Sequence, residues 1–198
     1  MMIEIDKYTF DSLLGPDGRN AAVWLHGCDK NCKGCISSRN SGEPGYIFNT
    51  RFLASLLVSR KPNTVVISGG EPFRQPRALD ELTRFIKEYT GGKTGLMIYT
   101  GMTYEQLADS TKTVKKILDR TDLLVDGEYI QKLDDGLPYR GSSNQRMLFL
   151  TERYSRDKLT AKERSVRMYI DANSLVMDGI PSAGEAELWN KIRKGEIV

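Results

Sequence analysis

Four short apolar segments recur along the chain, and each ends in glycine or meets a polar residue. Near-continuous apolar runs of this length are typical of strands that are covered on both faces of a parallel sheet. Neighbouring parallel strands must be joined by crossover connections, which narrows the folds that this chain can adopt. The segments are AAVWLHG (21–27), TVVISGG (64–70), GLMIYTG (95–101) and DLLVDG (122–127).

The stretches between these segments carry helical patterns. Residues 50–60 are expected to form a helix capped by Thr50, and residues 77–90 place their apolar side chains on one helical face. Residues 103–110 with 113–120 predict one further helix or a pair of helices. The alternation of strands and helices predicts right-handed βαβ units, and therefore the α/β class.

The C-terminal part of the chain has a different pattern. Residues 146–151 and 165–179 are expected to form antiparallel strands, the second segment folding back at 171–173. Residues 182–194 are expected to close the chain as a helix. We therefore expect a core domain at 1–150 and, at 151–198, a C-terminal extension that packs on the core rather than folding independently.

Composition and charge exclude several classes of protein. Hydrophobic residues make up 39% and charged residues 28% of the chain, which is ordinary for a globular domain. The net charge of +3 is too small to indicate a nucleic-acid partner. No apolar run reaches the roughly 18 residues that a membrane span needs, and the N-terminus lacks the apolar core of a signal peptide. We expect a cytoplasmic protein without a membrane partner.

All three cysteines lie in one stretch, HGCDKNCKGC (26–35), with the spacing C-x3-C-x2-C. An odd, clustered set of thiols in a cytosolic protein favours metal binding over disulfides. A structural zinc would need a fourth ligand, for which His26 is a candidate. A 4Fe–4S cluster on three thiolates would instead leave one iron open to a small molecule, and Gly27 and Gly34 would let the backbone wrap closely around it.

The polar elements of the chain follow the four predicted strands. The cysteine loop comes after the first strand, Gly69-Gly70-Glu71 after the second, Tyr99-Thr100-Gly101 after the third and Asp126-Gly127 after the fourth. Functional loops of parallel α/β sheets lie at the carboxyl ends of the strands. We therefore expect these elements to gather at one rim and to form one site.

These motifs carry a family resemblance. The cysteine spacing, followed by SGGEPF (68–73), resembles the signature of the radical S-adenosylmethionine enzymes. The late segment VMDGIP (176–181) resembles longer members of one family in that group, the anaerobic ribonucleoside-triphosphate reductase-activating proteins. Three more segments resemble the same family, namely YTGMTYEQL (99–107), LLVDGEY (123–129) and YRGSSNQRM (139–147).

The resemblance implies a fold and two cofactors. The fold would be a partial, open parallel β/α barrel of the radical S-adenosylmethionine type, carrying a small C-terminal β extension. The cofactors would be a 4Fe–4S cluster and S-adenosyl-L-methionine, the latter bound at the open iron. The implied cluster ligands are Cys28, Cys32 and Cys35.

The resemblance also implies cofactor-binding residues. Gly69, Gly70 and Glu71 would line the methionine end, and Ile36 stands where the family places an aromatic residue near the adenine. Asp126 either accepts from the ribose hydroxyls or caps its strand. We expect Gly70→Val to weaken S-adenosylmethionine binding while leaving the iron content near normal, because a branched side chain blocks close backbone approach.

The implied activity is that of an activating enzyme. One electron would cleave S-adenosylmethionine, and the resulting 5′-deoxyadenosyl radical would take a glycine α-hydrogen from an anaerobic ribonucleotide reductase. Reduced flavodoxin or a similar protein is the implied electron donor. The altered loop at 15–19 leaves open a radical enzyme that modifies another peptide or protein, and a non-enzymatic zinc or electron-transfer module is the third reading.

Three other residues have expected roles. His26 is expected to be structural rather than a metal ligand. Arg140 and Arg146 stand in a segment rich in Gly, Ser and Asn, and we expect them near the cofactor or the partner.

Overall fold

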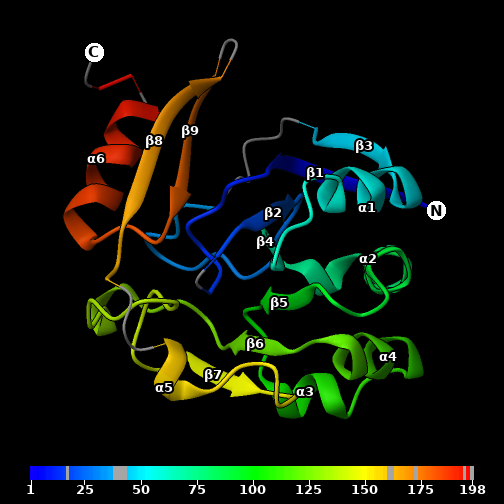
Figure 1. Cartoon of the computed structure of the whole chain (residues 1–198). Helices are drawn as coiled ribbons and strands as arrows, with labels where there is room; N and C mark the ends of the chain where they lie inside the picture. The colour runs from blue at the N-terminus through cyan, green and yellow to red at the C-terminus, as the bar shows by residue number, and fades with distance from the viewer. Residues whose placement is uncertain (17, 38–43, 160–162, 172–173, 194, 197–198) are drawn as a thin grey trace.

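The computed structural model describes residues 1–16, 18–37, 44–159, 163–171, 174–193 and 195–196. Its main feature is a seven-stranded sheet with the strand order β3-β1-β2-β4-β5-β6-β7, and a separate hairpin of β8 and β9 lies beside it (Figure 1). The fold is therefore α/β with a mixed central sheet, in agreement with the predicted class.

The centre of the sheet is parallel. β2 (Asn20–Leu25), β4 (Thr64–Gly69), β5 (Gly95–Tyr99) and β6 (Leu123–Asp126) lie side by side in this order and run in the same direction. Every residue of β2 and β6 is buried, because both faces of these strands are covered. All four predicted strands are confirmed.

The edges of the sheet are antiparallel. β1 (Met2–Thr9) pairs with β2 and β3 (Tyr46–Asn49) pairs with β1, while β7 (Arg146–Phe149) pairs with β6. The antiparallel strand expected near 146–151 is confirmed, but β1 and β3 are additions to the predicted fold. Ile3 and Ile5 are the buried positions of β1, and their alternation with Glu4 and Asp6 is its sequence signal.

Four helices lie on the right of the sheet in Figure 1: α1 (Thr50–Val58), α2 (Pro76–Thr90), α3 (Tyr104–Ala108) and α4 (Lys112–Arg120). The predicted helices are confirmed, and 103–120 forms a pair. The expected cap of α1 is corrected by one residue. The Asn49 side chain accepts hydrogen bonds from the amides of Arg51 and Phe52, whereas Thr50 is buried inside the first turn.

Two apolar cores form on the two faces of the sheet. In β2, Val23 and Leu25 point into the core shared with the helices, while Ala22 and Trp24 point into a second core on the opposite face. Ile180, from the C-terminal part of the chain, packs against the second core. The strands are therefore apolar on both sides, as their composition requires.

The C-terminal part comprises α5 (Arg156–Leu159), the hairpin strands β8 (Val166–Asp171) and β9 (Ser174–Gly179), and α6 (Ala183–Arg193). The predicted hairpin and final helix are confirmed, although 172–173 of the expected turn lie outside the described residues. The hairpin and α6 lie on the side toward which β4, β5 and β6 point, away from α1, α2 and α4 (Figure 1). No helix in the described ranges is long and apolar enough to cross a membrane.

Candidate active site

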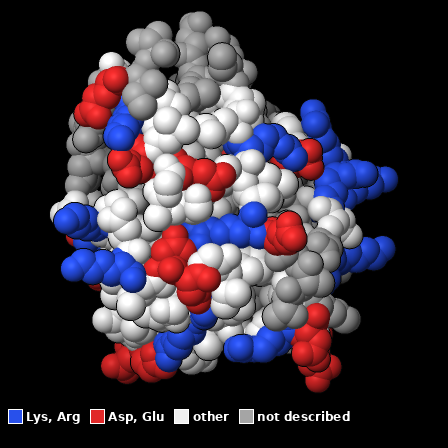
Figure 2. Space-filling model, turned by 90° about the vertical axis from the view of Figure 1, so that its left-hand side faces the viewer, with Lys and Arg blue, Asp and Glu red and all other residues white. Residues whose placement is uncertain are grey.

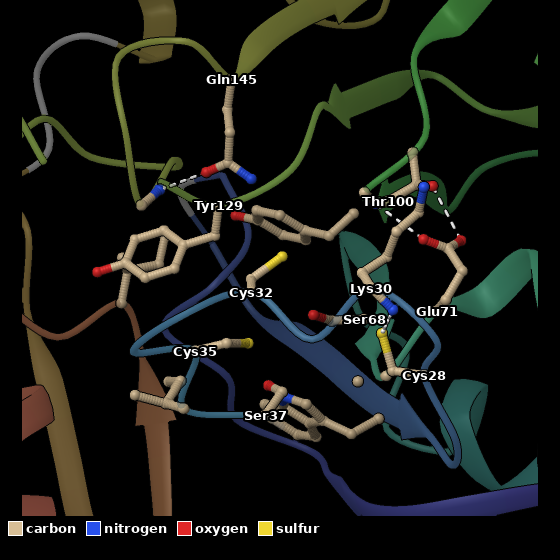
Figure 3. A pocket seen from close by; sticks show the side chains of 18 of the residues that line it. Cys28, Lys30, Cys32, Cys35, Ser37, Ser68, Glu71, Thr100, Tyr129 and Gln145 are labelled. Atoms are coloured by element: carbon tan, nitrogen blue, oxygen red, sulfur yellow. Dashed lines mark hydrogen bonds between the residues drawn. The ribbon is translucent and has the colours of Figure 1, made fainter. Parts of the chain in front are cut away.

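The carboxyl ends of the parallel strands meet at one pocket, shown from close by in Figure 3. The cysteine loop after β2, Gly69-Gly70-Glu71 after β4, Tyr99-Thr100-Gly101 after β5 and Gly127 after β6 all line it. The expectation that these elements gather at one rim is confirmed. A parallel sheet achieves this because its strands all end at the same edge.

The cysteine loop supplies three thiols to this pocket. Cys28, Cys32 and Cys35 all line it and are partly exposed, and the structure joins none of these three in a disulfide. Figure 3 shows Cys32 and Cys35 near each other on one side and Cys28 on the other side, next to Lys30 and Glu71. Gly27 and Gly34 have φ values of +84° and +78°, so glycine is required where the loop curls around the thiols.

The loop has the donor set of a cluster site with an open position. Burial raises the pKa of the Cys32 thiol, while a hydrogen bond with the Tyr129 backbone lowers it in part. Across the described residues, no three His, Cys, Asp or Glu side chains converge closely enough to hold one metal ion. Each thiolate of a 4Fe–4S cluster binds a different iron, so the three thiols need not converge on one point, and their place in one pocket fits a three-thiolate cluster.

The end of β4 is bound directly to the cysteine loop. The Gly70 amide donates to the Leu25 carbonyl at 2.8 Å, and the Glu71 amide donates to the Gly27 carbonyl at 2.8 Å. A Cβ on Gly70 would lie 2.0 Å from the Gly27 oxygen and 3.2 Å from Cβ of Cys28. The expectation for Gly70→Val therefore needs correction. The valine would displace the cysteine loop itself, so iron content would fall together with S-adenosylmethionine binding.

Glu71 holds two loops of the rim together. Its buried carboxylate accepts hydrogen bonds from the Phe73 amide at 3.0 Å, the Thr100 hydroxyl at 2.9 Å and the Gly101 amide at 2.8 Å. Burial raises the pKa of this carboxyl, and the three donors oppose that change. The side chain fixes the turn after β4 against the end of β5 (Figure 3).

Asp126 lies apart from the pocket lining. Its fully buried carboxylate accepts from the Tyr104 amide at 2.6 Å and from Nε of Arg146 at 3.0 Å. Arg146 also pairs with Glu105 at 2.7 Å. Of the two roles considered for Asp126, these contacts support the cap at the end of its strand, and the neighbouring Gly127 reaches the pocket instead.

The two arginines expected near the cofactor or partner do not line the pocket. Arg146 pairs with Asp126, and Arg140 pairs with Asp135. Their segment still contributes Gly141 and Gln145 to the wall. The arginines were expected there because their segment combines Gly, Ser, Asn and Arg, but nearby carboxylates pair with both of them.

His26 and Ile36 flank the cysteine loop in the sequence, and the structure places only Ile36 in the pocket wall. Nδ1 of His26 lies 2.7 Å from a carboxylate oxygen of Asp6, and the ring is not part of the pocket wall. This geometry agrees with the structural role expected for His26. Ile36 does line the pocket, directly after Cys35.

Several pocket residues were not predicted from the sequence. Lys30 lies on the cysteine loop, and its ammonium pairs with Glu128 at 3.2 Å. Burial lowers the pKa of Lys30, but Glu128 outweighs this effect and raises it overall. Tyr129, Gln145 and five residues after 148 also line the wall. The position of Lys30 inside the cysteine motif was a usable signal, and the segment 176–181 had been noted as a family resemblance but was not placed at the site.

A pocket with three clustered thiols at the carboxyl edge of an α/β sheet is the site of an iron–sulfur protein. Residues 13–148 match the family described as 4Fe–4S single cluster domain. A relative in Vibrio cholerae serotype O1, called anaerobic ribonucleoside-triphosphate reductase-activating protein, is 32% identical over 147 residues, covering 70% of this chain and 92% of the relative. The chain belongs to this family of activating proteins.

Other relatives of the same name extend the match. The protein of Escherichia coli K12 is 30% identical over 70% of this chain and 92% of its own length, and that of Enterobacteria phage T4 is 27% identical over 71% and 89%. The expected radical S-adenosylmethionine activating enzyme is thereby confirmed, as are its two cofactors, a 4Fe–4S cluster and S-adenosyl-L-methionine. The zinc or electron-transfer module is not the class of this chain.

Proposed function

We propose that this chain activates an anaerobic ribonucleotide reductase by generating a radical on one of its glycines. The observation that carries the proposal is that Cys28, Cys32 and Cys35 line one pocket, together with the backbone of Gly69 and Gly70, which packs closely against the cysteine loop. The names of the relatives supply the target, since they are activating proteins of that reductase.

Different residues of the pocket would hold the cluster and the S-adenosylmethionine. When bound, the reduced cluster supplies the electron that cleaves S-adenosylmethionine into methionine and a 5′-deoxyadenosyl radical. Cys28, Cys32 and Cys35 would hold the cluster through their sulfur atoms. Gly69 and Gly70 would line the methionine end, and Glu71 would act by holding their turn in place through Thr100 and Gly101.

The adenosine end of S-adenosylmethionine would lie on the Cys35 side of the cysteine loop. Ile36 lines the pocket after the third cysteine and would pack against the adenine. Tyr129 offers a second apolar surface, and burial raises the pKa of its hydroxyl, so the ring stays uncharged. We assign no ribose contact to Asp126, because Arg146 and the Tyr104 amide occupy its carboxylate.

The finer fold and the cellular setting form part of the same proposal. The parallel strands β2, β4, β5 and β6 would make an open, partial β/α barrel with the site at its rim. Residues 1–150 would be the catalytic core and 151–198 an extension packed on it. Reduced flavodoxin or a similar protein would supply the electron, in the cytoplasm.

The test is electron paramagnetic resonance of this protein mixed anaerobically with the reductase, S-adenosylmethionine and dithionite. The expected result is a stable organic radical whose hyperfine splitting collapses when the reductase carries α-deuterated glycine. Deuterium must also appear in the 5′-deoxyadenosine. Rapid cofactor cleavage without a glycine radical would contradict the proposal and would favour another peptide or protein as the substrate.

A further inference from the structure

Resting on this proposed function, we infer that the C-terminal extension builds the substrate-side wall of the active site and contacts the glycine-bearing segment of the partner enzyme. The family match ends at residue 148, so this wall lies outside the matched domain. Its members in the pocket lining are Arg164, Gly179, Ile180, Pro181 and Ala186.

The extension is fixed firmly to the core. The Asp178 carboxylate is buried and accepts from the Ser12 hydroxyl and the Leu13 amide, both at 2.7 Å. Ala186 and Trp189 of α6 are also buried. The wall is therefore part of the ordered site, and a partner would meet it already formed.

One arginine shapes the turn that enters the pocket. The Arg164 guanidinium pairs with Asp134, and its Nε donates to the Ile180 carbonyl at 3.1 Å. The same guanidinium also donates to the Pro181 carbonyl. Just before this turn, a Cβ on Gly179 would lie 2.3 Å from the Ser165 oxygen, and its φ is +108°, so glycine is required there.

The wall is apolar and its charges are paired. Ile180, Pro181 and Ala186 contribute hydrocarbon surface to the lining. Arg164, the charged residue that the extension contributes to the lining, is paired with Asp134. A charged side chain placed against this wall would lose its hydration without finding a counter-charge. The surface therefore suits an uncharged peptide segment of small or apolar residues around a glycine.

The wall lies at the opposite end of the pocket from the methionine-binding turn. Figure 3 shows Glu71 and Cys28 at one side and Cys35 at the other, where the ribbon of the C-terminal segment passes. A radical too reactive to diffuse must meet its target hydrogen inside the pocket, so the target segment has to reach this end. The wall is placed to contact it there.

The described outer face of the extension shows no patch of one charge that would favour the docking of a partner there instead of at the pocket. Figure 2 shows this side of the molecule, with basic and acidic side chains interspersed over the described surface. On α6, for example, Lys191 pairs with Glu187 at 2.7 Å. Mixed charges of this kind do not attract a partner of one sign, so this face gives no electrostatic argument against apolar contact at the pocket.

The test compares Ile180→Asp with the matched control Leu188→Asp, which changes an exposed residue of α6 outside the pocket. Glycyl radical yield and partner-free cleavage of S-adenosylmethionine are measured on anaerobically reconstituted proteins of known iron content. With Ile180→Asp, the radical yield should fall about tenfold more than the partner-free cleavage, since a desolvated carboxylate opposes the partner segment. Leu188→Asp should match the wild type in both.

A second measurement does not depend on the variant folding. Amide hydrogen exchange of the wild-type holoenzyme is followed with and without the reductase, and exchange should slow in residues 176–189 on complex formation. Unchanged exchange there, or equal losses of radical yield and partner-free cleavage in Ile180→Asp, would overturn the inference. Absence of any glycyl radical with the wild-type pair would instead reject the proposed function.

Discussion

Cys32 is the middle cysteine of the C-x3-C-x2-C loop, and its side chain lies in the pocket with those of Cys28 and Cys35 (Figure 3). We expect Cys32→Ala to abolish cluster assembly and S-adenosylmethionine cleavage together, because two thiolates hold a cluster poorly. Iron analysis and the visible absorption of the anaerobically reconstituted protein measure the first effect, and 5′-deoxyadenosine formation measures the second. A variant that kept full iron content and full turnover would show that the cluster is held elsewhere.

Gly70 makes a second prediction at this scale. We expect Gly70→Ala to lower iron content and cofactor binding together, since its Cβ would press on the Gly27 carbonyl at 2.0 Å and move the loop that carries Cys28. Gly184→Ala is the matched control, because nothing lies within 4 Å of its Cβ position. Normal iron content with weak cofactor binding would mean that the loop adapts, and that the glycine serves the cofactor alone.

At the scale of the elements, the Asp122 side chain joins α2, β5 and the segment that follows β7. Its carboxylate accepts from Lys87 of α2 at 2.6 Å, from the Leu96 amide of β5 at 2.8 Å and from the Thr151 hydroxyl after β7 at 2.8 Å. Burial alone would raise the pKa of Asp122, but these donors outweigh it and hold the pKa below the ordinary 3.8. The ionised carboxylate therefore stabilises the folded state.

We expect Asp122→Asn to lower the free energy of unfolding by about 2 kcal/mol near neutral pH, the usual size for a hydrogen bond with a charged group. Because the folded pKa is depressed, this contribution is present above pH 3.8 and is lost as the pH falls through the folded pKa. Urea unfolding at several pH values measures it, with exposed Asp119→Asn as the control. If the difference in unfolding free energy between the wild type and Asp122→Asn did not become smaller in acid, the depressed pKa of Asp122 would be contradicted.

The elements also show what the sequence alone can predict. The four parallel strands were predicted because their apolar runs are local and continuous. β1 and β3 were not, because these antiparallel strands are defined by pairings between residues far apart in the sequence, such as Ile5 with Leu25 and Glu4 with Ile47. Similarly, Asn49 and Thr50 are neighbours that can both cap a helix, and only the side-chain geometry shows that Asn49 is the cap of α1.

At the scale of the whole molecule, the pocket combines predictable and unpredictable parts. The cysteines and Gly69-Gly70-Glu71 were found because each motif is contiguous and follows a recognisable strand. The role of Asp126 could not be chosen, since it depends on Arg146, 20 residues away. The segment 176–181 was noted as a family resemblance, but its place in the site was not predicted, because only the tertiary packing of the extension brings Ile180 to the pocket.

The position of that wall late in the sequence has a consequence for biosynthesis. Chains emerge from the ribosome N-terminus first, and folding can begin before synthesis ends. The cysteine loop and all seven strands of the main sheet precede residue 150, whereas Ile180 and Pro181 follow it. The Cys35 end of the pocket therefore acquires this wall only after residues 180–181 have been translated, so the three thiols can meet an iron donor before the wall is present.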